Sequence, residues 1–228
     1  MTNRVPKHVA FIMDGNSRWS KKNKLSKQIG YKKGIETLEN LINICINKKI
    51  KIITVYALST ENIYRKDINI LYSIIKNFIN ESKSLDRFKN IDFRLLGKRE
   101  NINKKILSFF DKLEKNQSST KKIILNLAYN YGSWSELENC VKKISELYKD
   151  KKFKINEKKI RENLYTKNIP DPDLLIRTGG KKRLSNFLLL QLKYTELFFI
   201  DTLWPDFDEN VFLKILKEYQ SINRTFGL

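Results

Sequence analysis

The chain has 228 residues, of which 41% are hydrophobic and 11% aromatic, and its formal net charge at pH 7 is +20. This composition excludes an intrinsically disordered chain, and no apolar run approaches the ~18–20 residues that cross a bilayer. The N-terminus lacks the apolar segment and cleavage site of a secretory signal, so we expect a cytoplasmic protein. At this length a single domain, residues 1–228, is the simplest organisation.

The excess of positive charge comes from lysines that occur in nearly every segment of the chain. Such a spread favours a generally solvated basic surface over a groove for nucleic acid, and we therefore expect no nucleic-acid partner. Anionic substrates or an anionic membrane surface would still be attracted at low salt.

Short runs rich in β-branched residues alternate with longer segments of helical period, a pattern typical of a mostly parallel α/β sheet. The strands are continuous apolar runs, as expected where helices cover both faces of the sheet. A helix is expected to start at Ser133, because Ser133 and Glu136 have the spacing of a capping box. In chain order, we expect strands at residues 8–13, 51–58, 91–96, 122–128, 174–177 and 197–201, and helices at 35–46, 68–85, 101–113, 133–148 and 209–221.

The first strand runs into Asp14, and the residues Gly-Asn-Ser-Arg follow before helical periodicity resumes. Functional groups in parallel sheets lie beyond the carboxyl ends of the strands. Gly15 permits a tight turn, and a helix that starts near Trp19 would offer backbone N–H groups to an anion. A carboxylate beside an anion indicates a cation between them, and Mg²⁺ prefers one or two carboxylates plus phosphate oxygens. An alternative of equal weight is a tight turn in which Asp14 caps the helix.

Polar side chains also follow two other predicted strands. The second strand ends in a Ser-Thr-Glu-Asn-Ile-Tyr-Arg segment that begins at Ser59, although its hydroxyls could simply cap a helix. Near the C-terminus a strand delivers Arg177, and Arg183 and Ser185 follow two glycines. Arginine guanidinium groups match phosphate oxygens in bidentate fashion, so this segment suits a diphosphate. Glu196 precedes the last strand and could be a surface carboxylate or a second Mg²⁺ ligand.

The sequence contains no Cys-His pair, nucleophile elbow, Walker-type loop or zinc-ligand spacing. The single histidine, His8, starts a strand away from the expected site and is read as structural. Cys45 and Cys140 are expected to remain unpaired. The candidate chemistry therefore involves a carboxylate, Mg²⁺ and phosphate-binding groups without a protein nucleophile.

Three segments, HVAFIMDGNSRW, YALSTEN and the block from DLLIRTGG to LWPDF, closely resemble the cis-prenyltransferases, in particular bacterial undecaprenyl diphosphate synthases. The resemblance runs from about residue 6 to the end of the chain. It implies one α/β domain with a six-stranded mostly parallel sheet flanked by helices, an apolar tunnel, and a homodimer. It also implies Mg²⁺-dependent condensation of isopentenyl diphosphate with an allylic diphosphate, usually farnesyl diphosphate, in cis geometry. The product would be undecaprenyl diphosphate, the lipid-carrier precursor for cell-wall polysaccharides, and its release would involve peripheral membrane contact.

The resemblance also implies roles for individual residues. Asp14 would be the essential Mg²⁺ ligand, Glu196 the second metal ligand, and Asn62 the residue assigned to proton removal. The implied allylic diphosphate site comprises Gly15, Asn16, Ser17, Arg18 and Trp19, with Lys27 and Tyr31 nearby. Ser59, Thr60, Glu61 and Arg65 would contact substrate, and Arg177, Arg183, Leu184 and Ser185 would bind isopentenyl diphosphate.

Several positions depart from the family pattern, which usually has Arg at Lys27, His at Tyr31, Trp at Ile63, Glu at Asn69 and Arg at Thr225. A lysine supplies charge without the bidentate guanidinium. Because the main ligand positions are retained, we expect an active enzyme. A non-catalytic accessory subunit and a basic nucleic-acid-binding protein are the competing interpretations; the first typically lacks the Asp14 carboxylate, and the second leaves the Asp14 and Arg177 segments unexplained.

Overall fold

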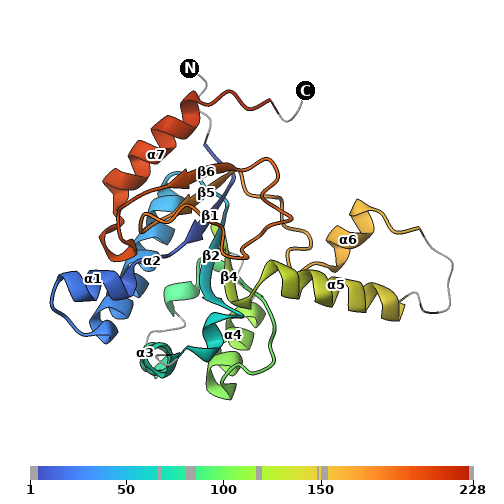
Figure 1. Ribbon diagram of the computed structural model, residues 1–228, viewed down its shortest axis with the longest axis horizontal. Coiled ribbons are helices and arrows are strands. Elements are labelled where there is room, and N and C mark those ends of the chain that lie inside the picture. Colours follow the sequence, from blue (N-terminus) through green and yellow to red (C-terminus); the bar gives the residue numbers. More distant parts are fainter. Residues whose placement is uncertain are drawn as a thin grey trace.

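The computed structural model describes residues 5–65, 68–80, 86–116, 120–147, 149 and 154–225. One six-stranded sheet forms its centre, with strand order β3-β4-β2-β1-β5-β6 and parallel pairing throughout (Figure 1). The predicted α/β fold is confirmed, and the sheet is entirely parallel. The strands are β1 (His8–Ile12), β2 (Ile52–Ser59), β3 (Ile91–Leu96), β4 (Ile123–Tyr131), β5 (Leu174–Arg177) and β6 (Glu196–Phe199).

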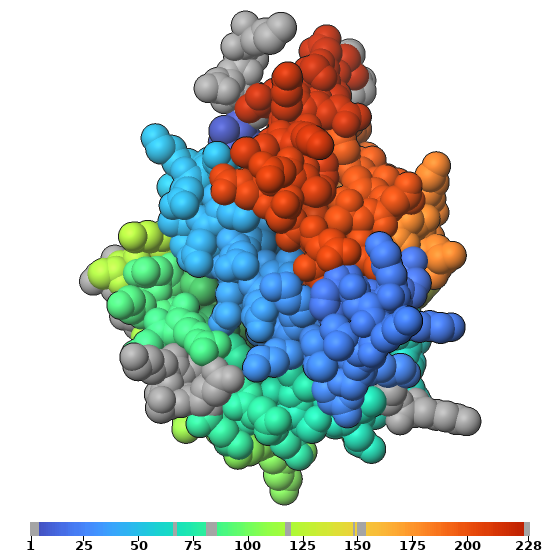
Figure 2. All heavy atoms as spheres, turned by 90° about the vertical axis from the view of Figure 1, so that its left-hand side faces the viewer, coloured from blue at the N-terminus to red at the C-terminus, as the bar shows by residue number. Residues whose placement is uncertain are grey.

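Helices cover both faces of the sheet (Figure 1). They are α1 (Asn16–Lys22), α2 (Lys27–Asn47), α3 (Ile68–Asn80), α4 (Lys104–Lys115), α5 (Ser133–Leu147), α6 (Glu157–Asn163) and α7 (Glu209–Ser221). Alternate strand residues such as Phe11 and Val55 pack with α2, α4 and α7 in the larger core cluster. Their neighbours, such as Ala10 and Leu175, pack with residues 187–192 on the opposite face. Figure 2 shows α2 (blue) between the C-terminal segment (red) and the green segment that follows α3.

The helix boundaries differ from the expected ones at two informative places. α1 begins at Asn16, whereas the sequence suggested a start near Trp19. α6 lies in a lysine-rich segment for which we expected neither a helix nor a strand. The Asn156 side chain caps α6 by accepting from the amide of Lys159 at 3.0 Å, a local signal that the surrounding lysines obscured. The C-terminal ends of the helices predicted at 68–85 and 133–148 lie outside the described residues.

α5 starts at Ser133 as predicted, but the predicted capping box is wrong. The Glu136 carboxylate is fully buried and accepts hydrogen bonds from Tyr131 Oη at 2.6 Å and Gln191 Nε2 at 2.9 Å. Tertiary partners therefore replace the local bond to the helix start that the spacing suggested.

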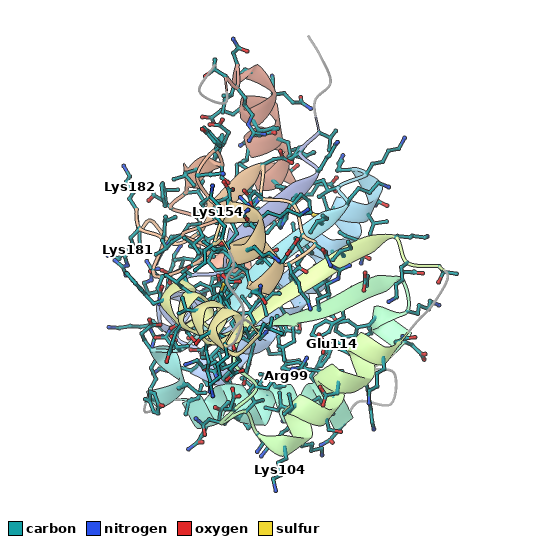
Figure 3. All side chains as sticks on the ribbon, turned by 90° about the vertical axis from the view of Figure 1, so that its right-hand side faces the viewer. Arg99, Lys104, Glu114, Lys154, Lys181 and Lys182 are labelled. Carbon is teal, nitrogen blue, oxygen red and sulfur yellow. The ribbon has the colours of Figure 1, made fainter. Side chains whose placement is uncertain are left out.

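Both cysteines are free and buried, Cys45 in the larger core cluster and Cys140 in a separate one beside α6. In Figure 3 the side chains of Lys181 and Lys182 project from one side of the molecule and that of Lys104 from another, in keeping with dispersed positive charge. Figure 3 also places Arg99 beside Glu114, an ion pair with an N–O distance of 2.5 Å. Within the described residues, no helix combines the length and apolarity needed to cross a bilayer.

His8 is buried in the centre of the sheet, as its structural interpretation predicted. Its Nδ1 lies 2.7 Å from the carbonyl oxygen of Pro170, and its Nε2 lies 2.7 Å from Thr54 Oγ1, which also accepts from Asn126 Nδ2. A carbonyl can only accept, so Nδ1 carries the proton and Nε2 accepts from the Thr54 hydroxyl. Burial lowers the pKa of His8 to about 4, against the raising effects of the Pro170 carbonyl and the nearby Asp173 and Asp171 carboxylates.

Because the pKa of His8 is lowered in the folded protein, we expect the free energy of unfolding to fall on mild acidification. The unfolded chain binds a proton at His8 near pH 6.5 and the folded protein only near pH 4, so the free energy of unfolding falls across that window and is fully retained above it. We expect a loss of about 2 kcal/mol between pH 6.5 and 5, measured by chemical denaturation. His8→Gln should remove most of this slope. Because His8 is the chain's only histidine, a folded-state NMR titration near pH 6.5 would contradict the prediction.

Candidate active site

The candidate site lies where the carboxyl ends of β1, β2 and β5 meet. β1 is hydrogen-bonded to β2 on one side and to β5 on the other, and the chain order reverses there. Such a switch point is where parallel sheets place ligand sites. A pocket of about 610 Å³ opens at these carboxyl ends and is lined by residues that follow all three strands.

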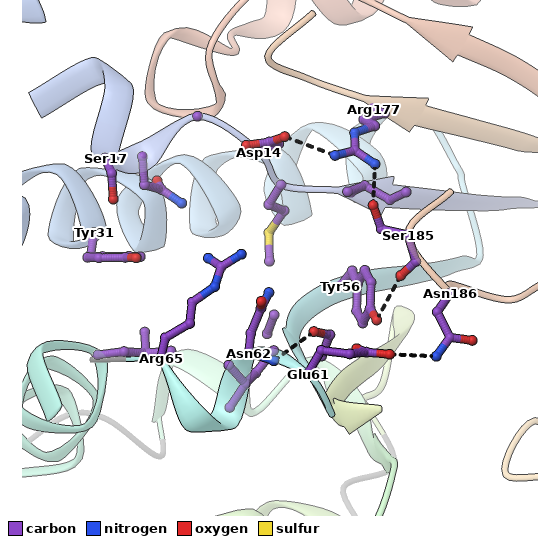
Figure 4. A pocket seen from close by; sticks show the side chains of 18 of the residues that line it. Asp14, Ser17, Tyr31, Tyr56, Glu61, Asn62, Arg65, Arg177, Ser185 and Asn186 are labelled. Atoms are coloured by element: carbon purple, nitrogen blue, oxygen red, sulfur yellow. Dashed lines mark hydrogen bonds and ion pairs between the residues drawn. The ribbon is translucent and has the colours of Figure 1, made fainter. Parts of the chain in front are cut away.

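Asp14 is held by its backbone and directs its carboxylate into the pocket (Figure 4). Its amide donates to Thr178 Oγ1 at 3.0 Å, and its carbonyl oxygen accepts from Thr178 Oγ1 and from the amide of Trp204. Gly15 follows with a φ of 124°, a conformation that side chains rarely adopt, and the chain then enters α1. No side chain caps α1, so Asp14 is not a helix cap. This geometry decides against the capped-turn alternative.

Two arginines from distant parts of the sequence bind the Asp14 carboxylate. Arg18 NH2 lies 2.9 Å from Oδ1, and Arg177 NH2 lies 3.0 Å from Oδ2. Arg18 also donates to the carbonyl oxygen of Gly179 at 2.6 Å, and a side chain at Gly179 would collide with the guanidinium. The two guanidinium groups therefore converge on one carboxylate and create a positively charged site next to it.

Arg177 is almost completely buried and organises the loop that follows β5. Its NH1 donates to Ser185 Oγ at 2.8 Å and to the carbonyl oxygen of Arg183, while NH2 contacts Asp14. Its Nε has no partner among the described residues. The guanidinium thus joins the Asp14 segment to the Arg183–Ser185 segment, as Figure 4 shows for Asp14, Arg177 and Ser185.

Residues that follow β2 form the opposite wall of the pocket (Figure 4). The amide of Asn62 donates to Ser59 Oγ at 3.1 Å, and Glu61 Oε1 accepts from Asn186 Nδ2 at 2.8 Å. Burial by itself would raise the pKa of Glu61, but hydrogen bonds from Asn186, Ser59 and Thr60 hold that pKa below its usual range. Glu61 is therefore a carboxylate at neutral pH.

Thirteen of the predicted site residues line this pocket, and the structure brings them together from four segments of the chain. They are Asp14, Gly15, Asn16, Ser17, Arg18, Tyr31, Ser59, Glu61, Asn62, Arg65, Arg177, Arg183 and Ser185. Trp19, Lys27, Thr60 and Leu184 do not line it. Trp19 instead donates from Nε1 to Asp206 Oδ1 at 2.6 Å, which turns its ring toward the 204–206 turn.

Glu196 lies at the opposite end of the strands from Asp14, so within one chain the two carboxylates do not approach a common ion, and its role as second metal ligand stays a prediction. Glu196 pairs in register with Leu174, at the start of β5, whereas Ile12 pairs with Arg177 at its end. The Glu196 carboxylate lies 3.5 Å from Arg224 Nε, and Arg224 NH1 lies 2.8 Å from Asp173. Within one chain, Glu196 is a structural ion-pair partner.

Tyr56 and Asn186 also line the pocket but were not singled out from the sequence. Tyr56 Oη donates to the carbonyl oxygens of Tyr131 and Ser185, and burial raises its pKa, so it stays a neutral donor. Its ring stacks on Phe187 with a centroid distance of 4.5 Å. Tyr56 looked like a core residue because it lies within an apolar strand. Asn186 could have been suspected from the sequence, because it directly follows the predicted site residue Ser185.

An apolar cavity of about 170 Å³ adjoins the polar pocket. Both are lined by Met13, Asn16, Tyr31, Tyr56, Ala57 and Leu71. The inner cavity is completed largely by apolar side chains from α2, α3, α4 and β4, including Leu38, Ile75, Phe78 and Phe109. Leu71, Ile75 and Phe78 of α3 line this cavity, whereas Ile53 and Val55 of β2 are buried in the core. The site therefore combines a charged entrance with an apolar interior.

Residues 12–227 match the family model described as putative undecaprenyl diphosphate synthase. The chain belongs to this family of prenyltransferases. Isoprenyl transferases from Fusobacterium nucleatum and Aquifex aeolicus are 41% and 39% identical to it, each over 100% of this chain and 98% of the relative. Lavandulyl diphosphate synthase from Lavandula x intermedia, solved with dimethylallyl diphosphate, has a TM-score of 0.91 and 29% identity over 98% of both chains.

Two glycines of α2 allow α1 to approach closely and present Asn16 to the pocket of this prenyltransferase. A Cβ at Gly34 would lie 2.3 Å from Asn16 Oδ1, and one at Gly30 would lie 2.6 Å from the Asn16 carbonyl oxygen. Trp204 Nε1 also donates to the Gly34 carbonyl oxygen at 2.8 Å. The start of α1 can therefore pack this closely against α2 because Gly30 and Gly34 carry no side chains.

Gly34→Ala is expected to separate activity from stability. The added methyl group must push the Asn16 amide aside, and displacements of about 1 Å in a site can cost up to ~10²-fold in rate, so we expect a 10- to 100-fold loss of turnover. Stability should change much less than turnover, because the gain of about 1 kcal/mol by which alanine favours the helix offsets crowding of the new Cβ against Trp204 Cδ1 at 3.1 Å. Steady-state kinetics and thermal melts test both effects, with the exposed neighbour Lys32→Ala as control. Unchanged turnover would contradict a role for Asn16.

Proposed function

We propose that this chain catalyses the Mg²⁺-dependent condensation of isopentenyl diphosphate with an allylic diphosphate, with farnesyl diphosphate as the primer. Repeated additions in cis geometry would yield a long-chain polyprenyl diphosphate, undecaprenyl diphosphate in our assignment. One observation carries the proposal: a carboxylate flanked by Arg18 and Arg177 opens onto a cavity lined largely by apolar groups. A prenyl diphosphate matches this arrangement, because its diphosphate is charged and its hydrocarbon tail is apolar.

The arginines suit the charge changes of the reaction. Cleavage of the allylic C–O bond leaves the bonding electron pair on the departing diphosphate, and Arg18 lies where it can stabilise that charge. The double bond of isopentenyl diphosphate then forms the new bond to the allylic carbon, and loss of a proton completes the addition. Groups that bind the growing negative charge act most strongly in the transition state.

The residues present fit a Mg²⁺ ion shared with substrate. Asp14 is partly exposed to the pocket, and the described residues contain no cluster of three or more acidic, histidine or cysteine ligands. Mg²⁺ commonly uses one or two carboxylates together with phosphate oxygens and waters, so Asp14 alone suffices on the protein side. When bound there, the ion would add to the stabilisation of charge on the diphosphate.

We assign Arg177, Arg183 and Ser185 to the isopentenyl diphosphate and Asn62 to positioning. An amide is barely basic, so Asn62 orients a water or the departing diphosphate, which accepts the proton. The side chains of Asn62 and Arg177 approach the same pocket from β2 and β5, on either side of Asp14. The two substrates would therefore lie side by side.

The decisive experiment incubates the protein with farnesyl diphosphate, labelled isopentenyl diphosphate and Mg²⁺, and separates the products by chromatography. We expect a long-chain cis product that is lost when EDTA removes the metal. A product with only a few added units would overturn the undecaprenyl assignment. No incorporation by folded protein would overturn the transferase activity and support an accessory-subunit role.

We also propose a homodimer that forms through α5 and the loop beside it. Trp134 and Val141 lie seven residues apart on α5 and are 71% and 59% exposed, and Leu189, whose amide donates to Ser133 Oγ, is 42% exposed. Exposed apolar groups gathered in this way are typical of protein interfaces. Sedimentation should give a dimer that Trp134→Glu weakens, whereas a monomeric wild type would contradict the proposal. Peripheral membrane contact stays a prediction.

A further inference from the structure

The loop that carries Ser185 has a strained backbone. Ser185, Asn186 and Leu188 have φ values of 52°, 61° and 49°, which lie in the left-handed region. Residues other than glycine enter this region at a cost in free energy, and asparagine tolerates it best. A loop with three such residues keeps its shape only where the surrounding structure holds it.

The contacts of Asn186 supply that support. Its side-chain Nδ2 donates to Glu61 Oε1 at 2.8 Å, and its Oδ1 accepts from the amide of Trp134 at 3.1 Å. Its backbone carbonyl oxygen accepts from the amide of Ser133 at 2.8 Å and from the Ser133 hydroxyl at 3.1 Å. Asn186 therefore caps the start of α5 from a distance and, at the same time, binds the segment after β2. Figure 4 shows Asn186 facing Glu61 from this loop.

Close packing leaves the Asn186 side chain little freedom. A Cβ at Gly132 would lie 2.7 Å from Asn186 Nδ2 and 2.8 Å from Thr60 Oγ1, so glycine at this position is what lets the amide reach Glu61. The preceding residue, Ser185, faces the other way and accepts from Arg177 at 2.8 Å. The loop is thus attached to β5 through Ser185 and to the β2 and β4 side through Asn186.

We propose that Asn186 is a positioning residue for the anion site: by joining Glu61 to the start of α5, it holds the Ser185 hydroxyl against Arg177 for the isopentenyl diphosphate. This inference rests on the proposed function, because it assigns the Arg177 and Ser185 groups to that substrate. Asn186 acts through Ser185 and does not itself contact the reacting atoms. Its loss should weaken binding at this site more than binding of the allylic diphosphate near Arg18.

The test uses Asn186→Gly, because glycine accepts the left-handed backbone and only the side-chain contacts are lost. Asn168→Gly is the matched control, since Asn168 has the same φ of 61° and is exposed outside the site. Calorimetry measures the binding of isopentenyl diphosphate alone and of farnesyl diphosphate alone, and neither reacts without the other. We expect the Kd for isopentenyl diphosphate to rise at least about tenfold in Asn186→Gly and the Kd for farnesyl diphosphate to change less than about threefold. Asn168→Gly should change neither.

A double-mutant cycle with Ser185→Ala tests whether Asn186 acts through Ser185. On that background, Asn186→Gly should change the Kd for isopentenyl diphosphate less than about threefold, because the group it positions is already missing. Additive effects would overturn the inference, and so would equal losses for both substrates or an unchanged Kd in Asn186→Gly.

A second variant covers the case in which Asn186→Gly does not fold. Asn186→Asp keeps an oxygen for the Trp134 amide, and so the start of α5, but loses the donor to Glu61. It should show the same selective, non-additive loss. Failure of the proposed function is distinguishable, because in that case the wild-type protein would neither bind isopentenyl diphosphate nor incorporate it. If the wild type binds and incorporates isopentenyl diphosphate and the Asn186 variants do so equally well, only the inference about Asn186 is overturned.

Discussion

Asp14→Asn is expected to lower kcat/KM by about 10³-fold, or ~4 kcal/mol of transition-state stabilisation. The amide has almost the shape of the carboxylate but carries no charge, so it would hold Mg²⁺ poorly and would no longer pair with both Arg18 and Arg177. Steady-state kinetics over a range of Mg²⁺ concentrations should show that added metal restores only a small part of the activity.

The control for this prediction is Asp111→Asn. Asp111 also pairs with an arginine, Arg99, at 2.5 Å, but it lies on α4 outside the pocket. It should retain wild-type kinetics. If Asp14→Asn kept activity within a few-fold of the wild type, the carboxylate would not be the metal ligand, and the proposed mechanism would fail.

Arg177→Lys is expected to reduce kcat/KM for isopentenyl diphosphate by about 10²- to 10³-fold, equivalent to ~3–4 kcal/mol. The buried guanidinium serves Ser185, the Arg183 carbonyl oxygen and Asp14 at once, through two nitrogens whose spacing is fixed. A lysine ammonium is a single point charge and cannot span these partners. The effect should appear mainly in KM for isopentenyl diphosphate.

Arg94→Lys provides the comparison for this substitution. Arg94 lies on β3 and pairs with Asp92 at 3.0 Å, so it tests an arginine-to-lysine change in the same sheet away from the pocket. Its kinetics should match those of the wild type. A thermal melt of Arg177→Lys completes the design: a full loss of activity accompanied by unfolding at assay temperature would assign Arg177 to stability, contrary to the prediction.

Much of the fold was predictable because the strands are buried on both faces. Runs such as β1 (His8–Ile12) and β5 (Leu174–Arg177) are continuous and apolar, and this pattern is peculiar to parallel sheets covered by helices. The bounds of β3 and α7 match the predicted ones for a different reason, because the apolar periodicity stops abruptly at their ends. The start of α1 was missed because Gly15 turns the chain without any capping side chain.

The candidate site was predictable in its residue types but not in its pairings. Asp14 and Arg177 could be assigned to strand ends from the sequence, because both directly follow or end apolar runs. Their ion pair joins residues 163 positions apart and depends on β1 lying next to β5. The register of β6 likewise could not be read from the sequence: it places Glu196 level with the start of β5, away from Asp14 within the same chain.

The sequence by itself determined which groups this protein can use: a carboxylate and arginines at strand ends, without a motif that activates a protein nucleophile. These features are local, since each depends on residue type and on the periodicity of neighbouring residues. Only the tertiary structure decided that Asp14 contacts two arginines rather than capping a helix, and that Glu136 and Asn186 anchor α5 and the Ser185 loop. Such contacts depend on strand order and register, which arise from packing between segments far apart in the chain.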